Sequence, residues 1–421
     1  MNAEQTSKIS PKESLFTALI IHCAVEIPFF IFPVILLLVG ADVFPSLGNL
    51  SWIGLGSIGT IGTLAMALPS PFFGLLADKY RRGVMMTLSL LIAIAGSLLI
   101  GFWGDSFFIL LLGMILQGTA LALYHPPGLS WVSTAYEDPE TKSYSKNYVK
   151  ILALHGIGGS LGSSLGPLSV YFFIDSLNSW RDIYLFWSIP LILVMIGFWV
   201  FTGRKEPKIV FPSNITLEIS QLKTNQNKSN INTQKYILLT VYFFIIAMSL
   251  TRGMVSFILS PFLSEEKGMI IATAALLIGV STLIGSTGQV FGGIIGDKYG
   301  ETALLSVTAL IQVFILIAIF NSTSSSILLL FYILLGITNA LFWPSTNSLV
   351  ARNSKHRGRA FGYVMLSANF FAALGPIIDG ILKVIDPNRY FLIFSFSGLF
   401  SLLAFLALVY LTIKLKKEAA T

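Results

Sequence analysis

The chain has 421 residues, of which 54% are hydrophobic and 11% are charged, with a mean hydropathy of +0.79 and a net charge of +7. No soluble core of this length could bury so much apolar surface, which excludes an ordinary soluble globular protein. The excess of basic residues is spread over many loops instead of one patch, which argues against a nucleic-acid-binding protein.

Twelve apolar segments are long enough to cross a bilayer, which takes about 20 residues as a helix. We predict them at residues 14–40, 47–73, 84–104, 107–134, 146–175, 182–202, 236–263, 270–293, 302–320, 326–350, 360–384 and 390–413. A cytoplasmic N-terminus puts 22 of the 27 Lys and Arg residues on the cytoplasmic side. By the positive-inside rule, we expect a multi-pass protein of the inner (plasma) membrane with both termini in the cytoplasm.

The first segment carries Glu26 near its midpoint and His22 one turn before it. An ionisable group inside a span is costly and is expected to face a cavity. Because residues four apart share a helix face, the carboxylate and the imidazole could share a proton. The alternative for Glu26 is a neutral carboxyl held by helix packing. Cys23 is the one cysteine, and no metal-site spacing or cofactor motif occurs, so we expect neither a metal nor a cofactor.

His125 and His155 lie at similar depths in the fourth and fifth segments, where they could face one another and relay a proton. Each could equally be a packed, hydrogen-bonded histidine. Gln117 and Asn339 are candidate cavity-lining groups, and hydrogen bonding between helices explains them equally well.

Between the sixth and seventh segments the chain turns rich in Asn, Ser, Thr and Lys, which predicts a mobile linker at residues 203–235. We therefore divide the chain into an N-terminal six-helix bundle at residues 1–202, this cytoplasmic linker, and a C-terminal six-helix bundle at residues 236–421.

Arg252 lies inside the seventh segment, and a guanidinium in a cavity suits a carboxylate, phosphate or phosphonate group. Its position corresponds to about 10 Å farther along the span than Glu26, at 1.5 Å per residue. We therefore expect no direct salt bridge between the two. The candidate substrate or proton site comprises Glu26, His22, Arg252, His125, His155, Gln117 and Asn339.

Two short motifs occur twice in the chain. GLLADKYRRG at residues 74–83 and GGIIGDKYGE at 292–301 place Asp78 and Asp297 219 positions apart, and ALYHP at 122–126 and ALFWP at 340–344 are 218 apart. This duplication predicts two membrane bundles related by an axis along the membrane normal, as in many secondary transporters. Asp379 and Lys383, one turn apart in the eleventh segment, are expected to form a local pair.

GLLADKYRRG resembles the signature loop between helices two and three of the major facilitator superfamily, and GGIIGDKYGE lies where that fold repeats it. QGTALALYHPPGLS at 117–130 and GGSLGSSLGPL at 158–168 are most similar to the branch that contains fosmidomycin-resistance exporters. The resemblance spans about 400 residues. It implies an all-α membrane protein with twelve transmembrane helices in two pseudo-symmetric six-helix bundles.

The resemblance assigns a gate role to Asp78, which would stabilise the outward-facing state, with Asp297 as its copy. Arg81 and Arg82 would meet carboxylates or lipid headgroups, or simply anchor the loop. The small residues of the two gating motifs are Gly74 and Gly293.

Helix five resembles, in part, the Gly-x-x-x-Gly-Pro motif of antiporters, in which Gly permits close helix approach and Pro removes a backbone hydrogen bond. Helix eleven repeats the Gly-Pro pair, so a general bending device is an equal explanation. The residues concerned are Gly162, Gly166, Pro167, Gly375 and Pro376.

These features predict a secondary active transporter that works by alternating access, with proton-coupled efflux of a small molecule as the first hypothesis. An uptake permease for a small organic anion, bound by Arg252, is the alternative, and a non-transporting membrane sensor is a third. Met114 stands where proton antiporters carry an arginine, which excludes coupling through that residue. No nucleotide-binding loop and no H-E-x-x-H motif occurs, so we expect neither a pump nor an enzyme. Expected partners are the substrate, protons and lipid, with no nucleic acid, and we expect a monomer.

Overall fold

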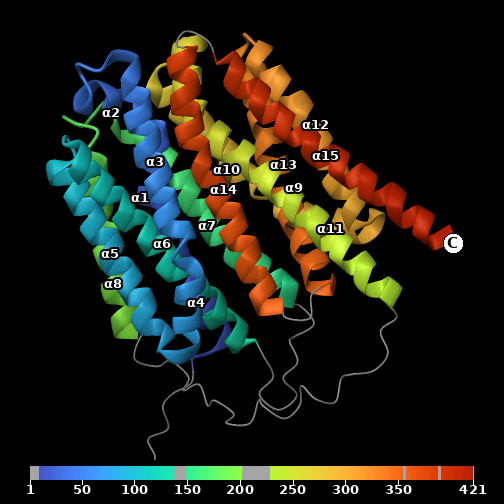
Figure 1. Ribbon diagram of the computed structural model, residues 1–421. Coiled ribbons are helices and arrows are strands. Elements are labelled where there is room, and N and C mark those ends of the chain that lie inside the picture. Colours follow the sequence, from blue (N-terminus) through green and yellow to red (C-terminus); the bar gives the residue numbers. More distant parts are fainter. Residues whose placement is uncertain (1–8, 137–147, 202–227, 354–356, 387–389, 421) are drawn as a thin grey trace, which may run out of the picture.

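The computed structural model describes residues 9–136, 148–201, 228–353, 357–386 and 390–420. These residues form helices and no strand (Figure 1). Eleven segments among them are long and apolar enough to cross a membrane. The predicted span that is not among the eleven is the glycine-rich α7 (Tyr148–Phe173), which packs within the bundle against α1 and α10. The described residues therefore have the all-helical architecture that the sequence predicts.

The first lobe runs from α1 to α8. Its elements are α1 (Pro11–Ile31), η1 (Phe32–Val34), α2 (Leu36–Val43), η2 (Gly48–Leu50), α3 (Ser51–Ala67), α4 (Ser70–Lys79), α5 (Arg82–Trp103), α6 (Phe107–Ala135), α7 and α8 (Asp182–Phe201). Ser10 and Glu13 form a capping box that starts α1. The predicted first span is interrupted after α1 by the 3-10 turn η1, because Pro33 has no N–H to continue the helical bonds.

The second lobe runs from α9 to α15. Its elements are α9 (Lys228–Pro261), the π-helical turn η3 (Phe262–Glu266), α10 (Ile271–Gly285), α11 (Gly288–Tyr299), α12 (Glu301–Asn321), α13 (Ser325–Asn353), α14 (Arg357–Ile385) and α15 (Phe391–Ala420). Helix α9 begins inside the predicted linker, and the rest of that linker up to residue 227 lies outside the described residues. Figure 1 shows the two lobes side by side, with α14 and α10 of the second lobe nearest the first.

The second predicted span of each lobe is broken in two, where we predicted continuous helices. In the first lobe the break lies at Leu68 and Pro69, between α3 and α4. In the second it lies at Ser286 and Thr287, between α10 and α11, 218 positions later. Pro69 has no N–H to donate, while the hydroxyls of Ser286 and Thr287 each donate to a carbonyl three residues earlier. The two breaks thus lie at equivalent positions of the duplicated halves, although different residue types are found at them.

The lobes touch along α3 and α14 through backbone. A methyl group added to Gly56 would lie 2.4 Å from the carbonyl oxygen of Pro376, and one added to Gly380 would lie 2.5 Å from that of Trp52. The backbone N–H of Ile377 donates to Oγ1 of Thr60 at 3.1 Å. These contacts hold the first half of α3 against the second half of α14.

A second contact between the lobes joins α7 to α10. A methyl group added to Gly279 would lie 2.6 Å from the Leu168 side chain and 3.1 Å from the carbonyl oxygen of Ser164. Ser260 at the end of α9 donates to the carbonyl oxygen of Val34 at 2.6 Å. Since α3 and α10 begin where α7, α9 and α14 end, both contacts lie at one end of the bundle.

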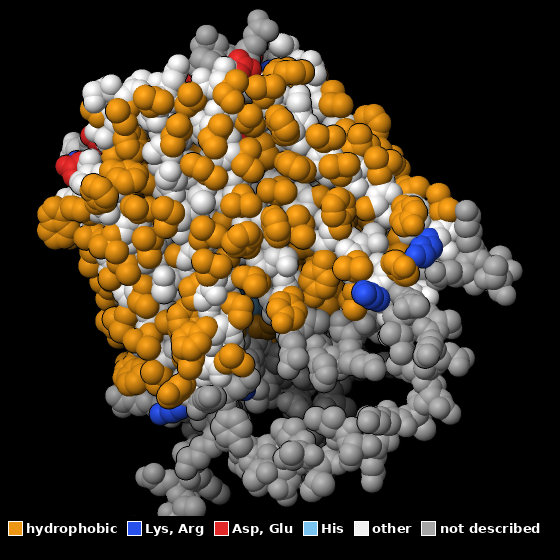
Figure 2. Space-filling model, viewed as in Figure 1, with side chains coloured by type: hydrophobic (Ala, Val, Ile, Leu, Met, Phe, Trp, Pro, Cys, Tyr) orange, Lys and Arg blue, Asp and Glu red, His pale blue; other side chains and the backbone are white. Residues whose placement is uncertain are grey.

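The outside of the bundle is apolar on the face that Figure 2 shows, where hydrophobic side chains cover most of the surface and charged ones appear only around its margin. Exposed side chains of this kind include Phe108, Leu193, Phe314 and Leu406, which are at least half exposed. A surface of this extent is typical of contact with lipid and agrees with the membrane-spanning helices.

Candidate functional site

Three ionisable side chains meet in the first lobe. Glu26 and His22 lie one turn apart on α1, with side chains 10% and 8% exposed, and His22 Nε2 is 3.4 Å from Glu26 Oε1. His125 comes from α6, and its Nε2 is also 3.4 Å from Glu26 Oε1. The His125 side chain is 34% exposed, so the group has access to solvent on that side. We call His22, Glu26 and His125 the triad.

Glycines on α7 allow α1, which carries His22 and Glu26 of the triad, to pack closely against that helix. A methyl group added to Gly162 would lie 2.4 Å from the carbonyl oxygen of Cys23 and 2.5 Å from Cβ of Glu26, and one added to Gly159 would lie 2.6 Å from Nε2 of His22. Gly166 makes the same approach to the carbonyl oxygen of Ile27, at 2.8 Å. The glycine motif of helix five therefore sets the distance between α7 and the triad.

The Gly-Pro pair of α14 has a similar role. A methyl group added to Gly375 would lie 2.3 Å from the backbone of Gly253 on α9, while Pro376 meets Gly56 of the first lobe. Pro167 and Pro376 both lie inside helices that continue past them. The contacts of these residues indicate close helix packing, and their predicted bending role stays a prediction.

Hydrogen bonds fix the orientation of two histidines. Tyr124 donates its hydroxyl proton to the carbonyl oxygen of Ala18 at 2.5 Å, so the contact of that hydroxyl with Nε2 of His155 at 3.0 Å makes His155 the donor. Nδ1 of His22 donates to the carbonyl oxygen of His155 at 3.2 Å. Nε2 of His22 is therefore the nitrogen that faces the carboxylate of Glu26.

The expected pair of His125 and His155 is arranged differently from the prediction. Each packs against the His22 ring, with ring centroids 5.1 Å and 4.8 Å from it. Tyr124, which the sequence analysis did not assign to the site, hydrogen-bonds His155, and its ring centroid lies 5.0 Å from that of His22. Its position beside His125 in the sequence was the one signal that could have assigned it to this site.

Arg252 lies on α9 and is partly buried, with its guanidinium carbon 5.8 Å from the centroid of the Trp343 ring. Within the described part of the chain, no ion pair joins it to Glu26, as its depth along the helix predicts. Arg252 is therefore a separate cationic group in the second lobe, stacked on an aromatic ring.

Gln117 and Asn339 serve as links between helices. Gln117 is fully buried and donates to the carbonyl oxygen of Ala93 at 3.1 Å and to Oγ of Ser97 at 3.0 Å, which joins α6 to α5. Asn339 accepts from Gln312 at 3.2 Å, which joins α13 to α12. These bonds match the interhelical explanation, and neither residue contacts the triad through them.

The two gating motifs begin and end helices. Arg82 is buried and donates to the carbonyl oxygen of Ser130 at 3.1 Å and to Oγ1 of Thr134 at 2.5 Å, so it anchors the start of α5 to the end of α6. Arg81 is exposed. The side chains of the two predicted gate residues, Asp78 and Asp297, lie outside the described part of the structure. A methyl group added to Gly74 would lie 3.8 Å from Cβ of Pro126, and one added to Gly293 would meet nothing within 4 Å.

The predicted pair of Asp379 and Lys383 is wrong. Lys383, whose side chain is 1% exposed, forms an ion pair with Glu265 of η3 at 3.0 Å, and the hydroxyl of Tyr390 also donates to Glu265. Asp379 is fully buried, and neither of its carboxyl oxygens has a hydrogen-bond partner among the described residues. Because α14 packs along α9, the lysine reaches the turn that ends α9 instead of its own helix neighbour.

Replacing Glu265 by glutamine is expected to destabilise the second lobe by about 1–3 kcal/mol, because the buried Lys383 ammonium would lose its charged partner. Thermal unfolding of the purified protein measures the effect. Glu266→Gln, which removes the same charge one exposed position later, is the matched control and should stay within about 0.5 kcal/mol. Equal effects of the two variants would contradict a specific ion pair.

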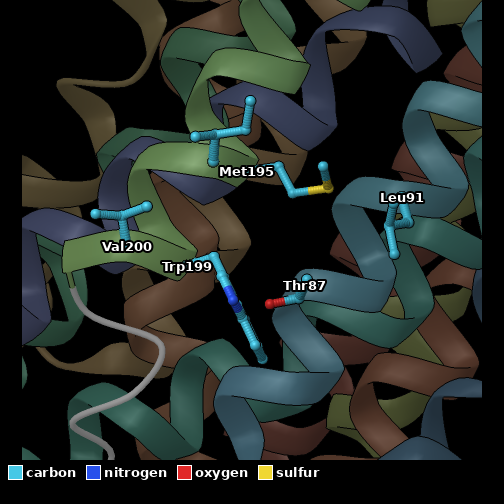
Figure 3. Close-up of a pocket in the computed structure, with 6 residues that line it drawn as sticks. Thr87, Leu91, Met195, Trp199 and Val200 are labelled. Carbon is cyan, nitrogen blue, oxygen red and sulfur yellow. The ribbon is translucent and has the colours of Figure 1, made fainter.

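A groove of about 210 Å³ lies on the outside of the first lobe, between α5 and α8. It is lined by Thr87, Leu91, Met195, Ile196, Trp199 and Val200 (Figure 3). Leu91, Ile196, Trp199 and Val200 are 41–54% exposed. The groove therefore belongs to the lipid-facing surface and not to the triad.

The chain matches the Major Facilitator Superfamily over residues 15–251 and 241–421. The protein belongs to this superfamily. It is a transporter and not an enzyme.

Several curated relatives of this major facilitator are transporters. It is 24% identical over 340 residues to the fosmidomycin resistance protein of Escherichia coli K12, covering 79% of each chain. It is 27% identical over 142 residues to a Na⁺, Li⁺, K⁺/H⁺ antiporter of Planococcus maritimus, covering 32% of this chain and 33% of the antiporter. It is 32% identical over 146 residues to a triacylglyceride transporter of Mycobacterium tuberculosis, covering 33% and 26%. The chain thus spans only about a third or less of the last two relatives, and the predicted similarity to fosmidomycin-resistance exporters is confirmed.

Solved structures support the fold. A bacterial homologue of the human lysosomal transporter Spinster, inward-facing and occupied, superimposes with a TM-score of 0.70 at 17% identity, covering 97% of this chain and 96% of that one. The unoccupied inward-facing form gives 0.67 at 16% identity, covering 98% and 96%. The major facilitator fold predicted from the loop motif is confirmed.

Proposed function

We propose that the protein exports a small molecule in exchange for protons, by alternating access between its two lobes. We place it in the inner membrane as a multi-pass monomer with both termini in the cytoplasm, since 22 of the 27 Lys and Arg residues then lie on that side. In this orientation the end at which α3 meets α14 and α7 meets α10 faces the outside. We propose that this arrangement is an inward-facing state, in which the exposed side of His125 opens toward the cytoplasm.

The observation that carries the proposal is the burial of Glu26 in the second half of α1, inside the first span, with two imidazole nitrogens 3.4 Å from one of its oxygens. A carboxylate at this depth needs a compensating cation, and we propose that protons entering from outside supply it. A fosmidomycin resistance protein and a cation/H⁺ antiporter among the relatives support export and proton exchange.

We propose Asp78 as the gate residue, with Asp297 as its copy in the second lobe. Arg82 supports this role by anchoring the loop that follows Asp78 to α6. When the lobes rock, the ends of α4 and α11 would meet the opposite lobe.

An uptake permease for a small organic anion is the second candidate. Arg252 favours it, because a partly buried guanidinium on the Trp343 ring has no ion-pair partner among the described residues. A carboxylate or phosphonate group of a substrate would supply one.

Flux in proteoliposomes tests the proposed function. Candidate compounds are first chosen by their ability to raise the unfolding temperature of the purified full-length protein. Under an imposed proton gradient an exporter moves such a compound against the direction of proton flow, and a permease moves it along with the protons. Stabilising compounds that cross at the rate of empty liposomes under both gradients would reject both functions.

Replacing Arg252 by alanine is expected to weaken binding of acidic compounds by about tenfold to a hundredfold, since a charge-assisted hydrogen bond contributes about 1.5–3 kcal/mol. Binding of neutral compounds should change little. Titration of a carboxylate compound and its amide analogue measures the difference, and Arg252→Lys, which keeps the charge, is the control. Equal weakening of both compounds would assign Arg252 a structural role.

A further inference from the structure

We propose that His22, Glu26 and His125 form a binding site for a divalent transition-metal ion such as Zn²⁺. The inference goes beyond the proposed function, because binding requires neither a gradient nor transport. The three ligand atoms come from two helices, and all lie within 4.8 Å of one another. The sequence predicted no metal because the spacing of ligands along the chain does not reveal that α6 brings His125 to α1.

The distances fit a metal ion better than direct hydrogen bonds. Both histidine nitrogens lie 3.4 Å from Oε1 of Glu26, beyond the normal 2.7–3.2 Å range for N–H···O bonds. Ligand atoms at about 2.0–2.2 Å from a tetrahedral zinc ion lie about 3.3–3.6 Å from one another. The two nitrogen–oxygen separations therefore match two edges of such a tetrahedron, whereas the ligand atoms as a group span up to 4.8 Å, so the two imidazoles would have to move closer together on binding the ion.

The hydrogen bonds around the triad also suit a metal site. Nδ1 of His22 donates to the carbonyl oxygen of His155 at 3.2 Å, which leaves the Nε2 lone pair free toward Glu26. A backbone acceptor on the second ring nitrogen is the usual support of a metal-ligating histidine, because it fixes the ring and its tautomer. His155 itself is occupied by Tyr124 and is not one of the ligands.

The donor set and its exposure define the kind of ion. Two imidazoles and one carboxylate suit Zn²⁺ and its neighbours in the first transition row, whereas Ca²⁺ and Mg²⁺ prefer oxygen ligands. The His125 side chain is 34% exposed, so a fourth position is open to water or to an anionic group of a bound compound. Three protein ligands with one open position are typical of zinc sites that exchange a ligand.

Metal binding is tested on the purified full-length protein in detergent, without any gradient. Zn²⁺ binding is measured by calorimetry, and Co²⁺ serves as a spectroscopic probe of coordination. We expect one ion per chain and a tetrahedral Co²⁺ spectrum. Glu26→Gln and His125→Asn should each weaken Zn²⁺ binding by more than about a hundredfold, since losing even a supporting partner costs about 10–100-fold.

Two controls keep the result interpretable. His356→Asn removes a histidine whose position lies outside the described residues, and it should leave the affinity unchanged. Unfolding temperatures of the ligand variants without metal show whether they fold, and His125→Asn, at the partly exposed ligand, is the milder of the two.

Wild-type protein that binds no ion, or binding that survives both ligand variants, would overturn the metal site. Binding that follows His356 would do the same. The flux measurements are independent: a protein that binds Zn²⁺ through the triad but carries no proton-driven flux would reject the proposed function and keep the metal site. Proton-driven flux in a protein without metal binding would reject the metal site alone.

Discussion

Replacing Glu26 by glutamine is expected to abolish proton-driven flux in proteoliposomes, to the level of empty vesicles. Glutamine keeps the shape of the side chain and removes the negative charge for which a proton would have to compensate. Binding of stabilising compounds should be retained, because the α1–α7 packing beside Glu26 involves its Cβ and not its carboxylate. The initial rate under an imposed pH gradient measures the effect.

Asp105→Asn is the matched control for this change. It removes a carboxylate from the same lobe, at a side chain that is 60% exposed and lies 3.4 Å from Arg181, its ion-pair partner among the described residues. Its flux should equal that of the wild type. Unchanged pH-driven flux in Glu26→Gln would reject the role of Glu26 in coupling, and loss of compound binding in that variant would assign it to the substrate site instead.

Replacing Gly56 by alanine is expected to move the protein out of the state in which α3 and α14 touch. The added methyl group would lie 2.4 Å from a backbone carbonyl oxygen of the other lobe, and no rotation of a side chain can relieve that overlap. Separation of the two helices relieves it completely. A change of about 5.5 kcal/mol in the balance of two states suffices to turn a 99:1 population into 1:99.

Distances between spin labels on the touching ends of α3 and α14 measure this shift. Gly197→Ala on α8, where an added methyl group meets nothing within 4 Å, should leave the distances unchanged. Gly162→Ala should lower the unfolding temperature without moving the lobes, because its neighbours Cys23 and Glu26 belong to the same lobe. A distance distribution in Gly56→Ala like that of the wild type would contradict the contact as a determinant of state.

The sequence predicted features that depend on local geometry. His22 and Glu26 meet because they are four positions apart on one helix, and the breaks in the second span of each lobe obey the duplicated sequence. The breaks themselves were missed, because Ser286 and Thr287 give little sign of interruption in an apolar run and because Pro69, which does give one, was included in a continuous span. The length of a span was therefore easier to predict than its continuity.

Partners that come from distant helices could not be predicted. His125 reaches Glu26 through the packing of α6 on α1, and helix depth alone suggested His155 as its neighbour. Lys383 was predicted to pair with Asp379 because the two are four positions apart, but it forms an ion pair with Glu265 in the turn η3 instead. When packing brings a charged partner on a neighbouring helix within reach, a side chain can pair with it instead of with the residue four positions away on its own helix.

The lobes meet through main chain at Gly56 and Gly380. At these two glycines no side chains interlock, so parting the backbones requires no change of rotamer there, while Thr60, Ser260 and Leu168 supply side-chain contacts elsewhere along the seam. Opening and closing can then proceed as the motion of two smooth, stiff bodies. A solute or ion bound between the lobes can therefore determine which of the two arrangements of the lobes is more stable.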